Sequence, residues 1–267
     1  MAIRTLFSLL VLVLLMACRL ADPSRPVADR KLVWSDEFDK PGLPDAAKWK
    51  YDVGGNGFGN NELQYYRGTR PENARIENGL LIIEARKEKY ENRDYTSAKL
   101  TTKGLGEWKY GRIDVRAKLP KGRGTWPAIW MLSAKNPLKW PLDGEIDIME
   151  HVGFNEDQIH GTIHTEAYNH TKHTEKTGIR KVPGVTQDFH VYSIDWTADK
   201  IDFLIDNEKY FTITKQETGS SYEQWPLDQP FYLILNVAVG GNWGGQKGVD
   251  ESIWPQRMEV DYVRVYQ

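Results

Sequence analysis

Short runs of alternating apolar and polar residues follow one another along most of the chain, and turn residues separate them. This pattern is typical of β-strands, in which successive side chains point to opposite faces. The segment 111–119 alternates in this way, and the continuous apolar run 231–239 predicts a buried strand. Helical periodicity is hard to find after residue 30, which favours an all-β fold.

Further strands are predicted at 80–85, 162–164, 192–196, 201–205, 210–213 and 258–266. The pairs Asn78-Gly79 and Asp206-Asn207 are expected to turn the chain between strands. No period of 20 to about 50 residues repeats along the chain. We therefore predict one antiparallel β-sandwich, a jelly roll of two sheets, with a concave cleft on its curved side.

The segment 145–150 holds three carboxylates, Glu145, Asp147 and Glu150, in an otherwise apolar run. Taking a carboxylate out of water costs on the order of several kcal/mol unless it is paired or neutralised. On a regular strand Glu145 and Asp147 share one face, and Glu150 falls on the other. A β-bulge of one residue would turn Glu150 to join them, as bulges do next to active sites. Two carboxylates on one face, with a third between them, suit the hydrolysis of a glycosidic bond.

The alternative interpretation of this segment is a half-exposed strand that carries ordinary surface acids. Ile146, Ile148 and Met149 leave little room for a solvated face, which argues against it. The ten tryptophans exceed what a core needs, and flat aromatic faces suit sugar rings. The net charge of −2 argues against nucleic acid or another polyanion as a partner.

The N-terminus has the features of a secretory signal, with Arg4 followed by a short apolar run, 6–17. The run ends in Leu-Met-Ala-Cys at Cys18, the single cysteine of the chain, so no disulfide can form within it. This ending resembles a bacterial lipoprotein signal, in which the cysteine is lipidated; a plain signal peptide remains the alternative. We predict a signal at 1–18, a tether at 19–30 and one catalytic domain at 31–267.

Six motifs together resemble glycoside hydrolase family 16, and within it the bacterial laminarinase-like endo-β-1,3-glucanases. The resemblance covers about residues 32–267 and rests on 34–38 (WSDEF), 60–66 (NNELQYY), 126–132 (WPAIWML), 144–150 (GEIDIME), 160–164 (HGTIH) and 239–243 (VGGNW). It implies a jelly roll that binds a β-glucan across its concave sheet.

The resemblance implies that Glu145 is the nucleophile, Glu150 the general acid/base, and Asp147 the residue that tunes their charge. Retaining hydrolysis needs the two carboxyl groups roughly 5–5.5 Å apart, one ionised and one protonated. Nearby like charges raise one of the two pKa values, which keeps the acid protonated near neutral pH.

Several other positions are expected to line the cleft. Trp126 and Trp130 have the same parity on a strand, so both could stack under sugar rings, although either could instead belong to the core. His160 and His164 also share parity, and the resemblance favours His164 as the one near the carboxylates. The remaining expected substrate-binding residues are Asn61, Arg86, Asn236 and Trp243; Arg86 could equally be a solvated strand charge.

The resemblance implies no cofactor for catalysis and a structural Ca²⁺ away from the cleft, held by Glu37, Gly79 and Asp261. Oxygen ligands of this kind suit calcium, although the two acids could also be ordinary surface carboxylates.

The function expected from these observations is endo-hydrolysis of β-1,3-glucan by a monomer that a lipid anchors to the bacterial cell envelope. Mixed-linkage glucan or a marine galactan is the alternative substrate, because loops at the ends of a cleft set this choice. The segment 60–64 (NNELQ) favours glucan over galactan. A protein that only binds β-glucan is the second alternative, and the presence of both glutamates argues against it.

Overall fold

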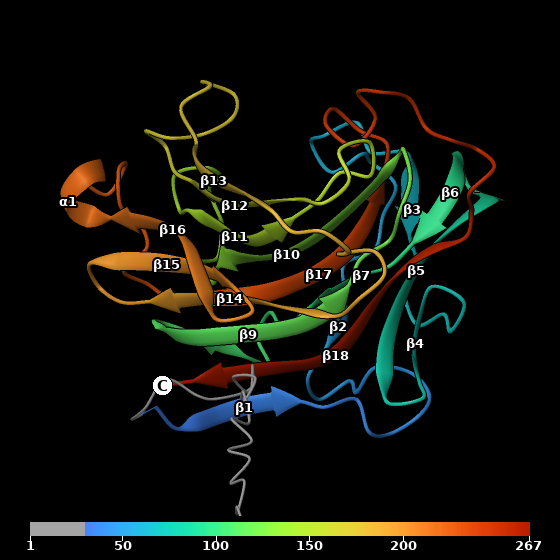
Figure 1. Ribbon diagram of the computed structural model, residues 1–267, viewed down its shortest axis with the longest axis horizontal. Helices are drawn as coiled ribbons and strands as arrows, with labels where there is room; N and C mark the ends of the chain where they lie inside the picture. The colour runs from blue at the N-terminus through green and yellow to red at the C-terminus, as the bar shows by residue number, and fades with distance from the viewer. Residues whose placement is uncertain (1–29) are drawn as a thin grey trace, which may run out of the picture.

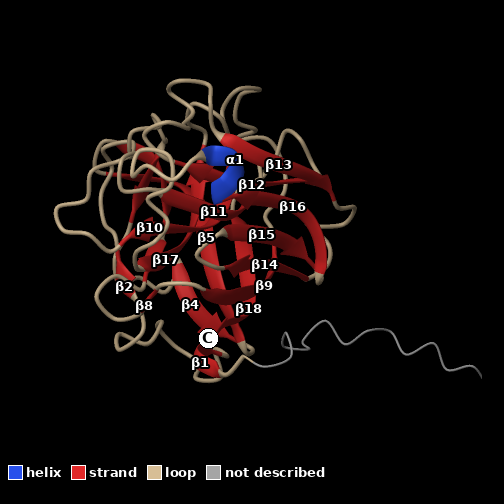
Figure 2. Cartoon of the chain, turned by 90° about the vertical axis from the view of Figure 1, so that its left-hand side faces the viewer, coloured by secondary structure: helices blue, strands red, loops and turns tan. Residues whose placement is uncertain are grey.

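The computed structural model describes residues 30–267 as two packed β-sheets with one short helix (Figure 1). The predicted signal, Cys18 and the tether up to residue 29 lie outside the described residues. Figure 2 shows the sheets as curved layers, and Figure 1 shows the four-residue helix α1 (Lys215–Thr218) beside β16 at one end. Within residues 30–267, no helix is both long and apolar enough to cross a bilayer. The prediction of an all-β sandwich is confirmed.

The first sheet has ten strands. Its order is β16 (Glu208–Thr214), β15 (Lys200–Ile205), β14 (His190–Trp196), β9 (Gly111–Lys118), β18 (Gln256–Tyr266), β5 (Leu80–Tyr90), β6 (Arg93–Ser97) and β3 (Gln64–Tyr66), with β1 (Leu32–Asp36) beside β18 and β4 (Ala74–Glu77) beside β5. The pairing between β3 and β6 is parallel, and the other pairings of this sheet are antiparallel.

The second sheet has eight strands, all antiparallel, and carries the carboxylate segment at its centre. Its order is β13 (Lys176–Lys181), β12 (Gln158–His164), β11 (Glu145–Glu150), β10 (Thr125–Ser133), β17 (Phe231–Val239), β7 (Lys99–Thr101) and β2 (Lys50–Tyr51), with β8 (Glu107–Trp108) beside β17. The apolar run predicted at 231–239 is therefore a central strand, and all nine of its residues are buried.

The core lies between the two sheets and takes every second side chain of the central strands. Ile129 and Met131 of β10 point into it together with Leu233 and Leu235 of β17, and all four are fully buried. The alternate residues of β10 and β17 therefore point to the opposite, concave face of the eight-stranded sheet. Asn78-Gly79 and Asp206-Asn207 are turns as predicted, and all four residues have positive φ angles.

Candidate active site

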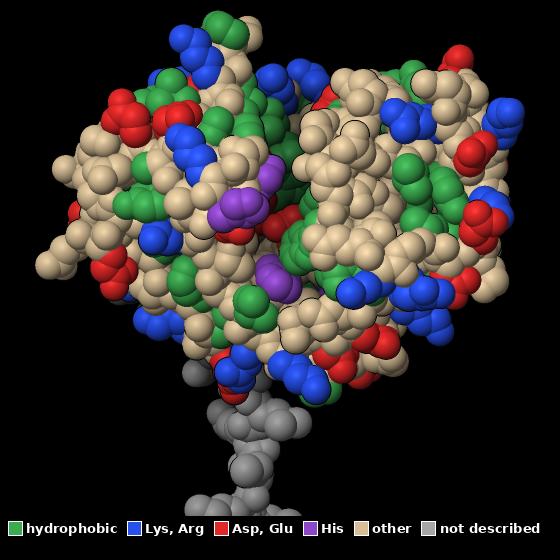
Figure 3. All heavy atoms as spheres, turned by 90° about the horizontal axis from the view of Figure 1, so that it is seen from above, with side chains coloured by type: hydrophobic (Ala, Val, Ile, Leu, Met, Phe, Trp, Pro, Cys, Tyr) green, Lys and Arg blue, Asp and Glu red, His purple; other side chains and the backbone are tan. Residues whose placement is uncertain are grey.

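The three carboxylates of β11 lie on the concave face of the eight-stranded sheet. Asp147 pairs with Trp130 of β10 on one side and with Thr162 of β12 on the other. Glu145 and Glu150 flank it along the same strand. Seen from above Figure 1, this side of the molecule is hollowed, with carboxylate and histidine side chains at the floor of the hollow (Figure 3). The interpretation of 145–150 as a solvated surface strand is wrong, because its residues are buried or nearly so.

A β-bulge turns Glu150 to the same face as the other two acids, as predicted. Between Asp147 and Glu150, two residues of β11, Ile148 and Met149, lie opposite the single residue Gly161 of β12. The pairing with β10 shifts at the same place. Both bulge residues are buried in the core. The even spacing of a strand is thus broken once, and the acids at positions 145, 147 and 150 come to share one face.

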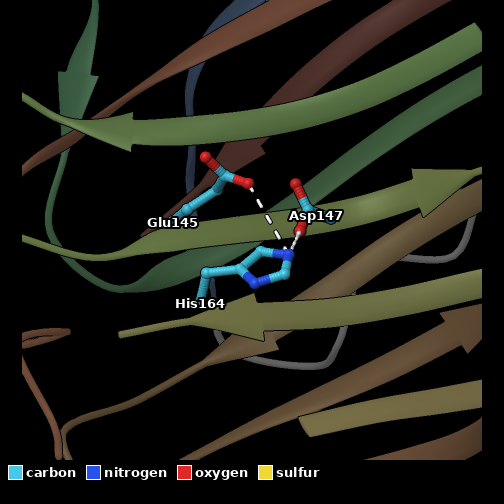
Figure 4. Close-up of side chains that lie close together, drawn as sticks. All are labelled: Glu145, Asp147 and His164. Atoms are coloured by element: carbon cyan, nitrogen blue, oxygen red, sulfur yellow. Dashed lines mark ion pairs between the residues drawn. The ribbon is translucent and has the colours of Figure 1, made fainter. Parts of the chain in front are cut away.

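His164 of β12 stands beside the first two acids (Figure 4). Its Nε2 lies 3.3 Å from Oδ2 of Asp147 and 3.8 Å from Oε1 of Glu145. All three side chains are largely buried. His164 therefore lies where the sequence predicted it, beside Glu145 and Asp147.

Two tryptophans each donate an indole hydrogen bond to one glutamate. Trp140, on the loop between β10 and β11, donates from Nε1 to Oε2 of Glu145 at 2.9 Å. Trp126, at the start of β10, donates from Nε1 to Oε1 of Glu150 at 3.0 Å. Trp126 therefore lies beside the acid/base position, whereas the sequence suggested a platform under a sugar or a core residue. Trp140 was not among the predicted residues, because its only signal in the sequence is a Trp-Pro pair shortly before the GEIDIME motif.

Burial is the largest influence on all three acids, and it raises the pKa of Glu145, Asp147 and Glu150 to about 8. The charge of Asp147 raises the pKa of both glutamates further. His164 and the Trp140 hydrogen bond act in the opposite direction on Glu145. A cluster with these pKa values holds protons at neutral pH, which is the condition for one carboxyl group to act as a general acid.

A buried hydrogen-bond chain supports the floor of the cleft next to the acids. Trp130 donates from Nε1 to Oδ1 of Asn236 at 2.7 Å, and Asn236 donates from Nδ2 to the hydroxyl of Tyr66 at 3.0 Å. The Tyr66 hydroxyl in turn donates to Glu62. Glu62 also accepts from Gln64 at 2.6 Å. The 60–66 motif thus orients Asn236, which fixes the indole of Trp130.

Lys99 of β7 completes this part of the floor, and no pattern in the sequence pointed to it. Its Nζ lies 5.0 Å from the centroid of the Trp130 ring and 4.5 Å from that of Phe58. It also forms an ion pair with Asp52 at 2.9 Å. Lys99 is the cross-strand neighbour of Asn236. Trp130 and Asn236 are therefore placed together, next to a buried cation.

The remaining predicted residues at the end of the cleft gather around Trp126. The ring of Trp243 packs edge-on against Trp126 at 5.7 Å and against His160 at 4.8 Å. His160 is the cross-strand neighbour of Glu150. Asn61 donates a hydrogen bond to Asn242, the residue before Trp243. Contact of these groups with a sugar stays a prediction.

Arg86 lies elsewhere. It forms an ion pair with Glu84, two residues earlier on β5. Ile83 and Ala85 of the same strand are fully buried in the core, so Glu84 and Arg86 point to the outer face of the ten-stranded sheet. This placement supports the alternative, a strand charge paired on the surface, over a sugar-binding role.

The acids expected to bind calcium each have an arginine partner. Arg264 holds Glu37 through two hydrogen bonds, of 3.0 and 2.8 Å, and Arg116 pairs with Asp261 at 2.6 Å. Gly79 lies in the turn between β4 and β5. A cation held by the Glu37 carboxylate would have to displace Arg264, whereas Arg116 occupies only Oδ2 of Asp261. Calcium binding here stays a prediction. Among residues 30–267, the one group of acidic and histidine side chains close enough to hold an ion is Glu145, Asp147 and His164.

A comparison with models of protein families matches residues 61–264 to "Glycosyl hydrolases family 16". The chain belongs to this family. It is 53% identical over 272 residues to a β-glucanase of Rhodothermus marinus, and the match covers 99% of this chain and 94% of that protein.

Solved structures of this family have the same fold. The laminarinase of Rhodothermus marinus is 56% identical and superposes with a TM-score of 0.87, over 89% of this chain and 97% of that one. A variant of SCLam, a non-specific endo-β-1,3(4)-glucanase with 1,3-β-D-cellobiosyl-glucose at its active site, is 51% identical with a TM-score of 0.87, over 90% of this chain and 96% of that one. The resemblance inferred from the six motifs is confirmed at the level of the family.

Proposed function

We propose that this protein is a retaining endo-glycosidase that cleaves internal β-1,3-glucosidic bonds of laminarin-like β-glucans. The observation that carries the proposal is the placement of Glu145, Asp147 and Glu150 on one concave face through the bulge at Ile148. Support for the substrate comes from the R. marinus laminarinase and from the glucan oligosaccharide at the active site of the SCLam variant.

The reaction proceeds by two displacements. Glu145 attacks the anomeric carbon while Glu150 gives its proton to the departing glycosidic oxygen, which takes the bonding electron pair. A glycosyl ester on Glu145 results. Glu150, now ionised, takes a proton from water, and the resulting hydroxide attacks the same carbon and releases Glu145. Two inversions leave the product with its original β configuration.

Each residue around the acids has a role in this sequence. The hydrogen bond from Trp140 and the nearby His164 lower the pKa of Glu145 against the burial that raises it, and so favour the ionised form that attacks. Burial keeps Glu150 protonated until the leaving oxygen needs the proton. Catalysis in this scheme needs no cofactor, because the two carboxyl groups supply both the nucleophile and the proton.

The test is hydrolysis of laminarin, lichenan, curdlan and agarose by the purified protein, with NMR of the first product formed. We expect cleavage of laminarin with the β-anomer appearing first, and loss of all but a few per cent of activity in Glu145→Gln. Preferred cleavage of lichenan or agarose would reassign the substrate to mixed-linkage glucan or a galactan. Initial α-product would exclude the retaining mechanism, and binding without turnover would make the protein a glucan-binding one.

We also propose that Cys18 carries a lipid that anchors the enzyme to the cell envelope, because it is the lone cysteine and ends a short apolar signal. Cys18→Ser should then move the protein from the membrane fraction to the soluble fraction. Wild-type protein that is wholly soluble would favour a simple signal peptide.

A further inference from the structure

The carboxyl group of Glu150 has two chemically different oxygens in this structure. Oε1 accepts the hydrogen bond from the indole of Trp126 at 3.0 Å. An indole N–H can only donate, so the oxygen that faces it must act as an acceptor. Among the described residues, no other donor forms a hydrogen bond with this carboxyl group. Oε2 is therefore the oxygen left for the proton.

We propose that Trp126 is a positioning residue that confines the transferable proton of Glu150 to Oε2. In a neutral carboxylic acid, the carbonyl oxygen is the better acceptor and the hydroxyl oxygen carries the proton. The indole N–H therefore stabilises the form of the acid in which Oε1 is the carbonyl oxygen. The hydroxyl group at Oε2 then donates the proton to the glycosidic oxygen. This inference rests on the proposed function of Glu150 as the general acid.

Other polar groups around Glu150 do not offer the same selection. Asp147 and His164 act on it through their charges, from β11 and β12. His160 is its cross-strand neighbour, but burial lowers the pKa of His160 to about 4 and its Nε2 has no hydrogen-bond partner among the described residues. Glu145, at the other end of β11, has its own indole partner in Trp140.

The indole of Trp126 is held in place by the glycine-rich 239–243 motif and the glycines that follow it. A Cβ on Gly244 would lie 2.8 Å from Cβ of Trp126, and one on Gly241 would lie 3.2 Å from Cζ3 of its ring. Gly241 also has a positive φ of 78°. Only glycine lets the backbone approach this closely. Together with the edge contact of Trp243, this packing gives the N–H a fixed direction, and it assigns a physical role to the motif.

The Trp126 hydrogen bond also acts in the transition state. As Oε2–H passes its proton to the leaving oxygen, negative charge develops on the carboxyl group, and a hydrogen bond to a charged acceptor is stronger than one to a neutral acceptor. The contact therefore stabilises the transition state more than the ground state. In the second displacement, water returns a proton to Oε2, and the same oxygen serves again.

The test uses the full-length protein and replaces Trp126 by Phe and, separately, by 3-benzothienylalanine, which keeps the bicyclic shape and lacks the N–H. The measurement is kcat/KM for aryl β-laminaribiosides whose phenols differ in pKa, and for laminarin. We expect about a ten- to hundredfold loss for laminarin and the poorest phenols, and less than about threefold for dinitrophenol, which leaves without acid assistance. The dependence of kcat/KM on leaving-group pKa should become steeper.

Trp243→Phe is the matched control, because it changes a ring of the same cluster without removing a hydrogen bond from Glu150. Its losses should be equal for all leaving groups. If the Trp126 variants, with melting temperatures near that of the wild type, also lose activity equally for all leaving groups, Trp126 acts by packing alone and the proposal is wrong. A wild-type enzyme that cleaves none of these glycosides would instead refute the proposed function.

Discussion

Tyr66 and Tyr192 are both fully buried, but their hydroxyl groups have opposite surroundings. The Tyr66 hydroxyl accepts from Asn236 and donates to Glu62. The Tyr192 hydroxyl has no hydrogen-bond partner among the described residues. Tyr66→Phe should therefore leave the side-chain amide of Asn236 without its acceptor and take one donor from Glu62, which keeps the hydrogen bond from Gln64. Tyr192→Phe should instead remove a hydroxyl group that already lacks a partner.

The magnitude follows from the cost of an unsatisfied buried group, about 1–3 kcal/mol each. For Tyr66→Phe, the unpaired amide of Asn236 and the hydrogen bond lost by the Glu62 carboxyl group together give a loss of about 2–4 kcal/mol in the free energy of unfolding. In a domain of this size that corresponds to a drop in Tm of roughly 5–12 °C. Tyr192→Phe should stay within about 0.5 kcal/mol of the wild type or be slightly more stable.

Urea unfolding of the wild type and the two variants, at one pH and one temperature, measures both changes. The slopes of free energy against urea should agree, so that differences in midpoint report stability. Tyr66→Phe should also raise KM for laminarin more than it lowers kcat, because Asn236 then no longer fixes the Trp130 indole. Equal destabilisation by the two substitutions would show that the hydrogen-bond chain contributes nothing beyond packing, and would refute the reasoning.

Three further predictions concern the glutamates. Because the general acid must be protonated and burial raises the pKa of Glu150 to about 8, kcat/KM should fall as the pH rises through about 8; a fall centred below pH 6 would contradict the assignment. Between pH 4.5, the ordinary pKa of a glutamate in the unfolded chain, and pH 8, the folded protein keeps a proton on Glu150 that the unfolded chain has lost, so the wild type loses stability as the pH rises. Glu150→Gln does not ionise, and it should therefore melt at a higher temperature than the wild type at pH 9. Trp140→Phe should raise the pKa of Glu145 and lower kcat/KM equally for all leaving groups, since the nucleophile is needed whatever departs; a loss that grows with leaving-group pKa would argue against this role.

The strands were predictable because their alternation is physical: one face meets the core and the other meets the cleft. The same rule located the carboxylates, and burial of charge in 145–150 was sufficient to predict the bulge. Alternation does not say which sheet a strand joins, however. The side chain of Arg86 points away from the core, as its position on the strand predicts. Because β5 belongs to the ten-stranded sheet, that face lies on the side of the molecule away from the cleft.

Trp140 could not be located in advance, because it lies on an irregular loop whose course depends on distant contacts. Asp143 of this loop accepts a hydrogen bond from Tyr222 at 2.6 Å, and its backbone carbonyl accepts one from Gln229 at 2.8 Å. These contacts join segments about 80 residues apart in sequence, and no local pattern reports them. Likewise, the arginine partners of Glu37 and Asp261 become visible only in three dimensions.

The bulge in β11 couples the spacing of the acids to the volume of the core. Ile148 and Met149 are consecutive, yet both side chains are buried in the hydrophobic core. A chain with one residue fewer here could form a regular strand that still presents three acids on one face, at every second position. That chain would lack one large core side chain. Larger side chains at neighbouring core positions, such as that of Ile129 beside Met149, would then be needed to fill the space. In related chains, insertions or deletions between the catalytic acids should therefore be accompanied by changes in side-chain size on the core-facing side of the sheet.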